Sequence, residues 1–213
     1  NTLLDSYICS NLLTMQALMA KDSSLSSQFN NFSFSITEPA AVLTDLKTKI
    51  AADFPQGPDV SYDIKYITEA LQDSVSQLDN LNINSIYINP KGTRSSQLYP
   101  TLAHEGYPGH LYQTTYFADS DPDLIRYLIA PDGYVEGWAT YCELFSYSYA
   151  DTGNPLLNTL AQANYATILC LYAKCDLGIN ALGWTESDVT SYIADFGFTD
   201  KNVAHEMYLS MVS

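Results

Sequence analysis

Two of the three histidines in this chain bracket the heptapeptide HEGYPGH at 104–110. Neutral imidazole is the commonest metal-ligating side chain, and a carboxylate beside a metal-bound water can act as a general base. Glu105 directly follows His104, and His110 ends the heptapeptide. The segment therefore predicts a zinc site of the metallopeptidase kind.

The spacing of these histidines does not suit an undistorted helix. In the zinc-protease motif H-E-x-x-H the histidines are at i and i+4, about 40° apart around the helix, whereas i and i+6 lie about 240° apart. Pro108 disfavours helical backbone before it and removes a helical hydrogen bond, and Gly109 can adopt almost any conformation. We therefore expect a break at 107–109 that turns His110 back toward His104. The alternative is a helix end with two surface histidines.

A second segment, DGYVEGWATYCELFSYSY at 132–149, carries two carboxylates that could complete the site. Glu136 and Glu143 are seven residues apart, so on a helix they share a face. A catalytic zinc takes three protein ligands and keeps one position open, and Glu136 could be the third. Glu143 could accept the ring N–H of a ligand histidine, as such sites usually need. The alternative is an acidic face in solvent, but the apolar neighbours suggest that few faces of this helix are in water.

These segments resemble a known bacterial family. HEGYPGH followed by YVEGWATYCE is similar to the family catalogued as domain of unknown function 885, whose signature is H-E-x-x-P-G-H and then a Y-V-E-G-W block. IYIN at 86–89 and DLGINALGWT at 176–185 also resemble that family, so the likeness covers residues 60–213. Many members have a second histidine after the one that matches His110, where this chain has Leu111.

The resemblance implies a function and a set of site residues. The family resembles helical zinc metallopeptidases, which implies His104, His110 and Glu136 as zinc ligands and Glu105 as the general base. The implied substrate is a peptide or a small amide. Family members are much longer, so we expect this chain to be a C-terminal-half fragment.

Two other functions stay open. The chain could be a non-catalytic helical binding or scaffold module on which the metal motif is degenerate, and metal content would separate this from an enzyme. Two histidines and a carboxylate also suit non-haem iron oxygenases, although those usually have β scaffolds.

Hydrolysis would also need a hydrogen-bond donor for the oxyanion. Tyr107 and Tyr134 lie within the two segments, and His205 and Tyr208 lie in a predicted C-terminal helix. The residues themselves do not distinguish among these four. A lone histidine on an amphipathic helix, such as His205, is more often a surface or core residue than a functional one.

Composition restricts the class of protein. The chain has 213 residues, of which 46% are hydrophobic and 15% charged, so we expect a single globular domain over 1–213. The formal net charge of −15 argues against nucleic acid and anionic membrane surfaces as partners. No apolar run reaches the roughly 18 residues that a transmembrane helix needs. Nothing in the sequence indicates the oligomeric state.

The four cysteines do not settle the compartment. None of them forms a C-x-x-C motif, and Cys142, Cys170 and Cys175 stand in apolar stretches where free cysteine behaves as a small hydrophobe. The low lysine content and the many Ser, Thr, Asn and Tyr residues favour the cell envelope or secretion for the parent protein. The cytoplasm is also compatible with the sequence.

The elements that must position the site are mainly helical. The expected fold is a mainly α, helical zinc-metallopeptidase-like domain with a small β-hairpin or sheet near the active-site cleft. The β element is predicted at 62–90, with strands at 62–67 and 81–89, and the metal-site helices at 98–150. Other helices are predicted at 2–20, 39–54, 123–129, 155–179, 185–196 and 199–212, with a loop at 21–33. Pro39 marks the start of the helix at 39–54, and a capping box of Thr185 with Asp188 marks the start of the helix at 185–196.

Overall fold

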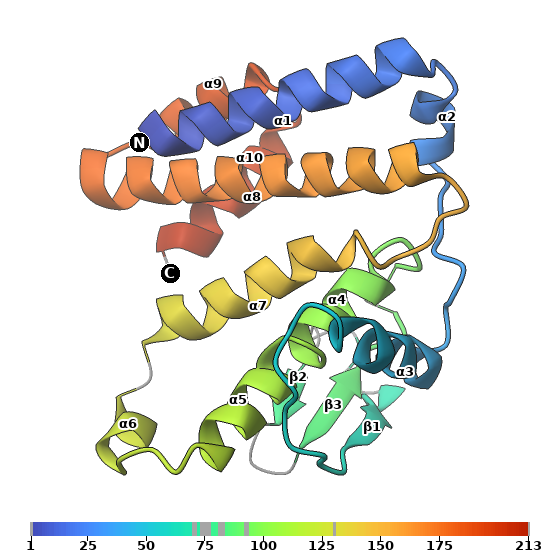
Figure 1. Cartoon of the computed structure of the whole chain (residues 1–213). Helices are drawn as coiled ribbons and strands as arrows, with labels where there is room; N and C mark the ends of the chain where they lie inside the picture. The colour runs from blue at the N-terminus through green and yellow to red at the C-terminus, as the bar shows by residue number, and fades with distance from the viewer. Residues whose placement is uncertain are drawn as a thin grey trace. The chain divides into compact units, whose positions relative to one another are not determined.

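The computed structural model describes residues 2–69, 72, 78–80, 84–91, 94–129 and 131–212. These residues form a mainly α structure with a small sheet, as predicted (Figure 1). By internal contacts the chain divides into two compact units. One unit is Ser27–Thr159, and the other combines Asn1–Ser26 with Leu160–Ser213.

The unit Ser27–Thr159 contains every residue of the predicted metal site. Its helices and strands are α3 (Pro39–Ile50), β1 (Asp63–Tyr66), β2 (Leu78–Asn80), β3 (Ser85–Ile88), α4 (Leu98–Glu105), α5 (His110–Asp119), α6 (Ile125–Leu128) and α7 (Asp132–Ser146). Helix α4 packs mainly against α7 and α3, and α5 packs against α7.

The small β element is a sheet and not a hairpin of the two predicted strands. Its order is β1-β3-β2, where β1 runs parallel to β3 with Asp63 opposite Ser85, and β2 runs antiparallel to β3. Parallel neighbours cannot be joined by a tight turn, so the alternation at 62–67 and 81–89 predicted the strands but not their pairing. Residues 81–83 of the second predicted strand lie outside the described residues.

The core of this unit lies around the end of α4. Helix α3 begins with Pro39 in its first turn and is capped by the Glu38 side chain. Its buried residues are Val42, Leu43, Leu46 and Ile50. It ends at Ile50 and not at the predicted residue 54. The side chains of Leu43 and Ile86 lie directly against Gly106, which follows α4. Burial of these apolar residues therefore fixes where α4 ends.

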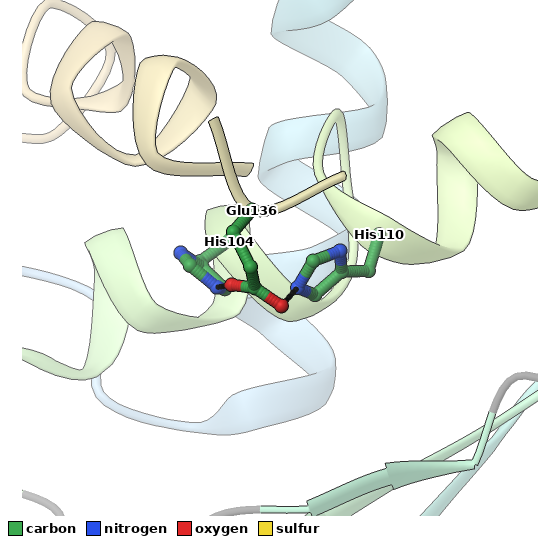
Figure 2. Close-up of side chains that lie close together, drawn as sticks. All are labelled: His104, His110 and Glu136. Carbon is green, nitrogen blue, oxygen red and sulfur yellow. Dashed lines mark ion pairs between the residues drawn. The ribbon is translucent and has the colours of Figure 1, made fainter. Parts of the chain in front are cut away.

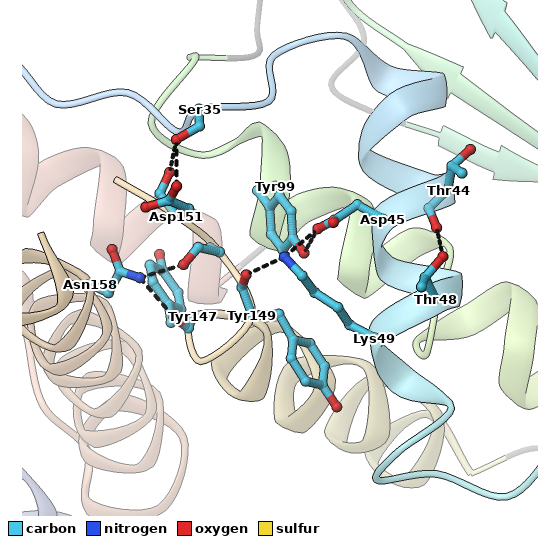
Figure 3. A network of polar contacts seen from close by, with 11 residues as sticks. Ser35, Thr44, Asp45, Thr48, Lys49, Tyr99, Tyr147, Tyr149, Asp151 and Asn158 are labelled. Carbon is cyan, nitrogen blue, oxygen red and sulfur yellow. Dashed lines mark hydrogen bonds and ion pairs between the residues drawn. The ribbon is translucent and has the colours of Figure 1, made fainter. Parts of the chain in front are cut away.

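A partly buried polar network ties α3 and α4 to the segment that follows α7 (Figure 3). The Lys49 ammonium donates to Asp45 at 2.7 Å and to the Tyr149 carbonyl at 2.7 Å. The Tyr99 hydroxyl donates to the same Asp45 carboxylate at 2.6 Å. Burial and this bond hold the pKa of Tyr99 well above its usual range. The network thus connects α4, which carries His104, to the segment that follows α7, which carries Glu136.

The other unit is built from helices alone in the described residues. It comprises α1 (Thr2–Lys21), most of α8 (Pro155–Leu182), α9 (Glu186–Ala194) and α10 (Lys201–Val212). Its core consists of Cys175, Val189, Ile193, Ala204 and Met207. The predicted capping box of Thr185 with Asp188 is present at the start of α9.

Two predictions outside the site also have an outcome. The predicted loop at 21–33 contains a short helix, α2 (Leu25–Phe29), because Leu25 is fully buried. All four cysteines are free thiols, and of the three predicted to be buried, Cys142 and Cys175 are buried and Cys170 is partly buried.

None of the described helices is both long and apolar enough to cross a membrane.

Candidate metal centre

The helix that carries His104 is interrupted where the sequence predicted. Helix α4 ends at Glu105, α5 begins at His110, and residues 106–109 form the turn between them. The Gly109 amide donates to the Ala103 carbonyl at 2.9 Å, so the turn folds back over the end of α4. The His104 and His110 rings lie edge to face with centroids 4.8 Å apart. The turn therefore removes the angular mismatch that a regular helix would impose.

Gly109 is required in this turn because the chain passes close to the end of α4. A Cβ atom at this position would lie well under 3.0 Å from the backbone carbonyl oxygens of His104 and Ala103. The chain therefore passes too close to α4 for any side chain here, which is a reason for glycine that the sequence did not suggest.

Three ligand atoms converge beside the turn. Glu136 Oε2 lies 3.5 Å from His104 Nε2, and Glu136 Oε1 lies 3.5 Å from His110 Nε2. Figure 2 shows the carboxylate between the two imidazole rings. All three ligand atoms lie within 4.8 Å of one another. Two ligands of a tetrahedral zinc at about 2.1 Å are about 3.4 Å apart, so the two 3.5 Å separations are close to those around one such ion.

Glu143 contacts the far side of the first histidine. Its Oε2 lies 3.1 Å from His104 Nδ1, and its side chain is 10% exposed. Glu136 and Glu143 thus approach the two nitrogens of one ring, as their predicted common helix face requires. With Nδ1–H donated to Glu143, Nε2 of His104 is left with its lone pair toward the cluster.

The carboxylates give the cluster a negative field. Burial lowers the pKa of His104, but the hydrogen bond to Glu143 and the charges of Glu143, Glu105 and Glu136 outweigh it, so the pKa lies above its ordinary value. A cation at Nε2 would therefore compete with a proton. The same charges favour the cation once that proton has left.

The surroundings of α7 differ from the prediction. Ala139, Cys142, Glu143 and Ser146 are buried. The first turns of the helix are in water, and the Glu136 side chain is 61% exposed. The expectation that few faces of this helix are exposed to solvent is therefore wrong for its first half. The ligand set combines two recessed histidines with one exposed carboxylate, and such a site is open to solvent on one side.

Glu105, the predicted general base, is the last residue of α4 and is partly buried. Its charge is among those that raise the pKa of His104. It therefore stands close to the cluster without belonging to the ligand group.

The four predicted oxyanion donors lie in different surroundings. Tyr107 is buried against Lys47 and Tyr62, and burial, followed by the charges of Tyr62 and Asp59, raises its pKa to about 12. Tyr134 is 69% exposed on the first turn of α7. The other two candidates, His205 and Tyr208, belong to the other unit, where His205 pairs with Glu186 at 3.1 Å and Tyr208 packs on the core.

One contact at the turn was not predicted. The Trp138 indole N–H donates to the Pro108 carbonyl at 2.8 Å, and the Cys142 thiol lies 3.5 Å from the same oxygen. From the sequence, Trp138 is only one of the apolar neighbours of Glu136 and Glu143. The available signal was its indole N–H, because a buried tryptophan usually finds an acceptor.

We expect Glu143→Gln to weaken zinc binding about 10- to 100-fold, because a neutral amide orients and polarises the His104 ring less well than a carboxylate. The measurement is competition for zinc against a chromophoric chelator. Glu186→Gln is the matched control, since it makes the same change at a histidine-paired glutamate in the other unit. Equal zinc affinity in both variants would contradict the role assigned to Glu143.

Comparison with known proteins gives a family and a fold. The family model described as "Bacterial protein of unknown function (DUF885)" matches residues 36–209. A crystal structure described as that of "the putative lipoprotein from Colwellia psychrerythraea" is 18% identical in sequence, with a TM-score of 0.77 over 99% of this chain and 41% of that chain. This chain thus spans less than half of the length of that protein. The comparison with curated proteins found no match.

Proposed function

Because the chain belongs to the DUF885 family of bacterial proteins of unknown function, we propose a function from its own site: it is the zinc-binding part of a metallopeptidase-like hydrolase. The observation that carries the proposal is the convergence of His104, His110 and Glu136 on one point, with Glu105 next to the first of them. The substrate class is a peptide or another small amide.

The donor set favours zinc over other metals. Two imidazole nitrogens and one carboxylate oxygen, with a fourth position open, form a common ligand set of catalytic zinc. Non-haem iron enzymes use the same donors but usually on β scaffolds. Here all three donors stand on α4, α5 and α7, which supports zinc.

The protein's own residues divide the chemical work. A bound zinc ion would supply a Lewis acid and lower the pKa of an attacking water. Glu105 would accept a proton from the attacking water and pass it to the leaving amine. Glu143 keeps His104 in one tautomer and one orientation. The exposed side of Glu136 is where an amide substrate would enter.

We also propose that the protein is located at the cell envelope. The low lysine content and the many hydroxyl and amide side chains support this location. The description of the structural relative as a lipoprotein supports it as well.

Metal content tests the proposal directly. We expect the purified protein to contain about one zinc per chain and His110→Ala to lose it, because two remaining ligands bind zinc weakly. Elemental analysis of protein prepared without added metal or chelator measures this and also distinguishes zinc from iron. His205→Ala, which removes the histidine of the other unit, is the control and should keep the metal. Absence of metal from the wild type, or its retention in His110→Ala, would overturn the proposal.

A further inference from the structure

We infer that Trp138 is a positioning residue of this centre, whose indole N–H holds the Pro108 carbonyl and thereby fixes the turn that delivers His110. The inference rests on the proposed zinc site. It adds a residue that binds neither metal nor substrate and acts only through the backbone.

The contact joins the two ligand-bearing segments. Pro108 lies two residues before His110, and Trp138 lies two residues after Glu136. The 2.8 Å bond from the indole to Pro108 therefore ties α7 to the turn close to both ligands. The 3.5 Å separation of Glu136 Oε1 from His110 Nε2 depends on how the turn sits against α7. Because metal ligands must be held within about 0.5 Å of their binding geometry, a shift of the turn would disturb the site.

The Pro108 carbonyl is buried, and in the described part of the chain both side chains that donate to it come from α7. Pro108 is among the fully buried residues. Cys142, one helical turn after Trp138, is the second group on its carbonyl, but a thiol is a weak donor. A buried carbonyl that loses its main donor is costly to leave unpaired, so removal of the indole N–H should shift the turn.

The indole is oriented by the rings around it. Trp138 lies edge to face with Phe54, with centroids 6.0 Å apart and an interplanar angle of 86°, and its centroid is 6.1 Å from that of Tyr141. Phenylalanine can keep much of this packing but has no N–H. Trp138→Phe therefore separates the hydrogen bond from the hydrophobic contact.

The test compares zinc affinity and the visible spectrum of the cobalt-loaded protein. In Trp138→Phe we expect zinc affinity to fall about tenfold, within the range known for residues that support metal ligands. We also expect the cobalt absorption bands to change, because they report the ligand geometry and not the overall stability. Trp184→Phe is the control: it changes the chain's other tryptophan, which packs on Gly178 and Tyr192, and should leave both readouts unchanged even if stability falls.

A second variant covers the case in which Trp138→Phe does not fold. In the Trp184→Phe background, Trp138 is replaced by benzothienylalanine, which keeps the bicyclic shape and exchanges only the N–H for sulfur. The same fall in affinity and the same spectral change would support the inference. A folded variant with wild-type zinc affinity and a wild-type cobalt spectrum would overturn the inference about Trp138 and leave the proposed function standing. A wild type that binds neither zinc nor cobalt would overturn the proposed function and this inference with it.

Discussion

Glu105→Gln should lower kcat/KM for amide hydrolysis about 10²- to 10⁴-fold and leave zinc bound, because a general base contributes roughly that much to the rate. The amide has nearly the same size as the carboxylate but cannot accept the proton of the attacking water. Glu105 is outside the ligand group, so metal retention is part of the prediction. The measurement is hydrolysis of a peptide that the wild type cleaves, with zinc content determined on the same sample.

The chain offers a matched control for this substitution. His205 and Glu206 repeat the His-Glu dipeptide on α10, where Glu206 is exposed and takes no part in the proposed site. Glu206→Gln should keep wild-type activity. If zinc-loaded Glu105→Gln also keeps it, then Glu105 is not the base and another group must accept the proton.

Gly109→Ala should disrupt the metal centre through the backbone alone. The added Cβ cannot be accommodated against the carbonyl oxygens of Ala103 and His104, so the turn between α4 and α5 must move. We expect a loss of about 1–3 kcal/mol in the free energy of unfolding, as for other overpacked sites. We also expect a fall of at least about tenfold in zinc affinity, since His110 moves with the turn. Denaturant unfolding and chelator competition measure the two effects.

The control is the same substitution one residue after the third ligand. A Cβ at Gly137 would meet no described atom within 4 Å, and the residue lies inside α7. Alanine is favoured over glycine in a helix interior by about 0.5–1 kcal/mol, so Gly137→Ala should raise stability and keep zinc affinity. A Gly109→Ala protein that also gains stability would show that the turn is looser than the structure indicates.

Local patterns predicted the helices well, because their signals act over one or two turns. Pro39 and the capping box of Thr185 with Asp188 mark helix starts that the structure confirms. The strand segments were also recognisable from alternation. Their parallel pairing was not, because pairing depends on contacts between residues far apart in sequence.

The ligand residues of the candidate site could be predicted from the sequence, but the contacts that position them could not. Pro108 and Gly109 predicted the helix break, and the seven-residue spacing predicted that Glu136 and Glu143 face one side. Sequence did not predict the exposure of Glu136 or the hydrogen bond from Trp138, since both depend on how α7 lies against the turn.

The sequence alone thus predicts which groups could bind a metal, where the helix must break, and which carboxylates share a face. Only the folded chain shows that His104, His110 and Glu136 converge, that Gly109 is needed for close approach, and that α7 contacts the turn. Backbone preferences and helical periodicity are properties of neighbouring residues. The approach of α7 to α4 follows instead from packing of the whole unit around a shared core.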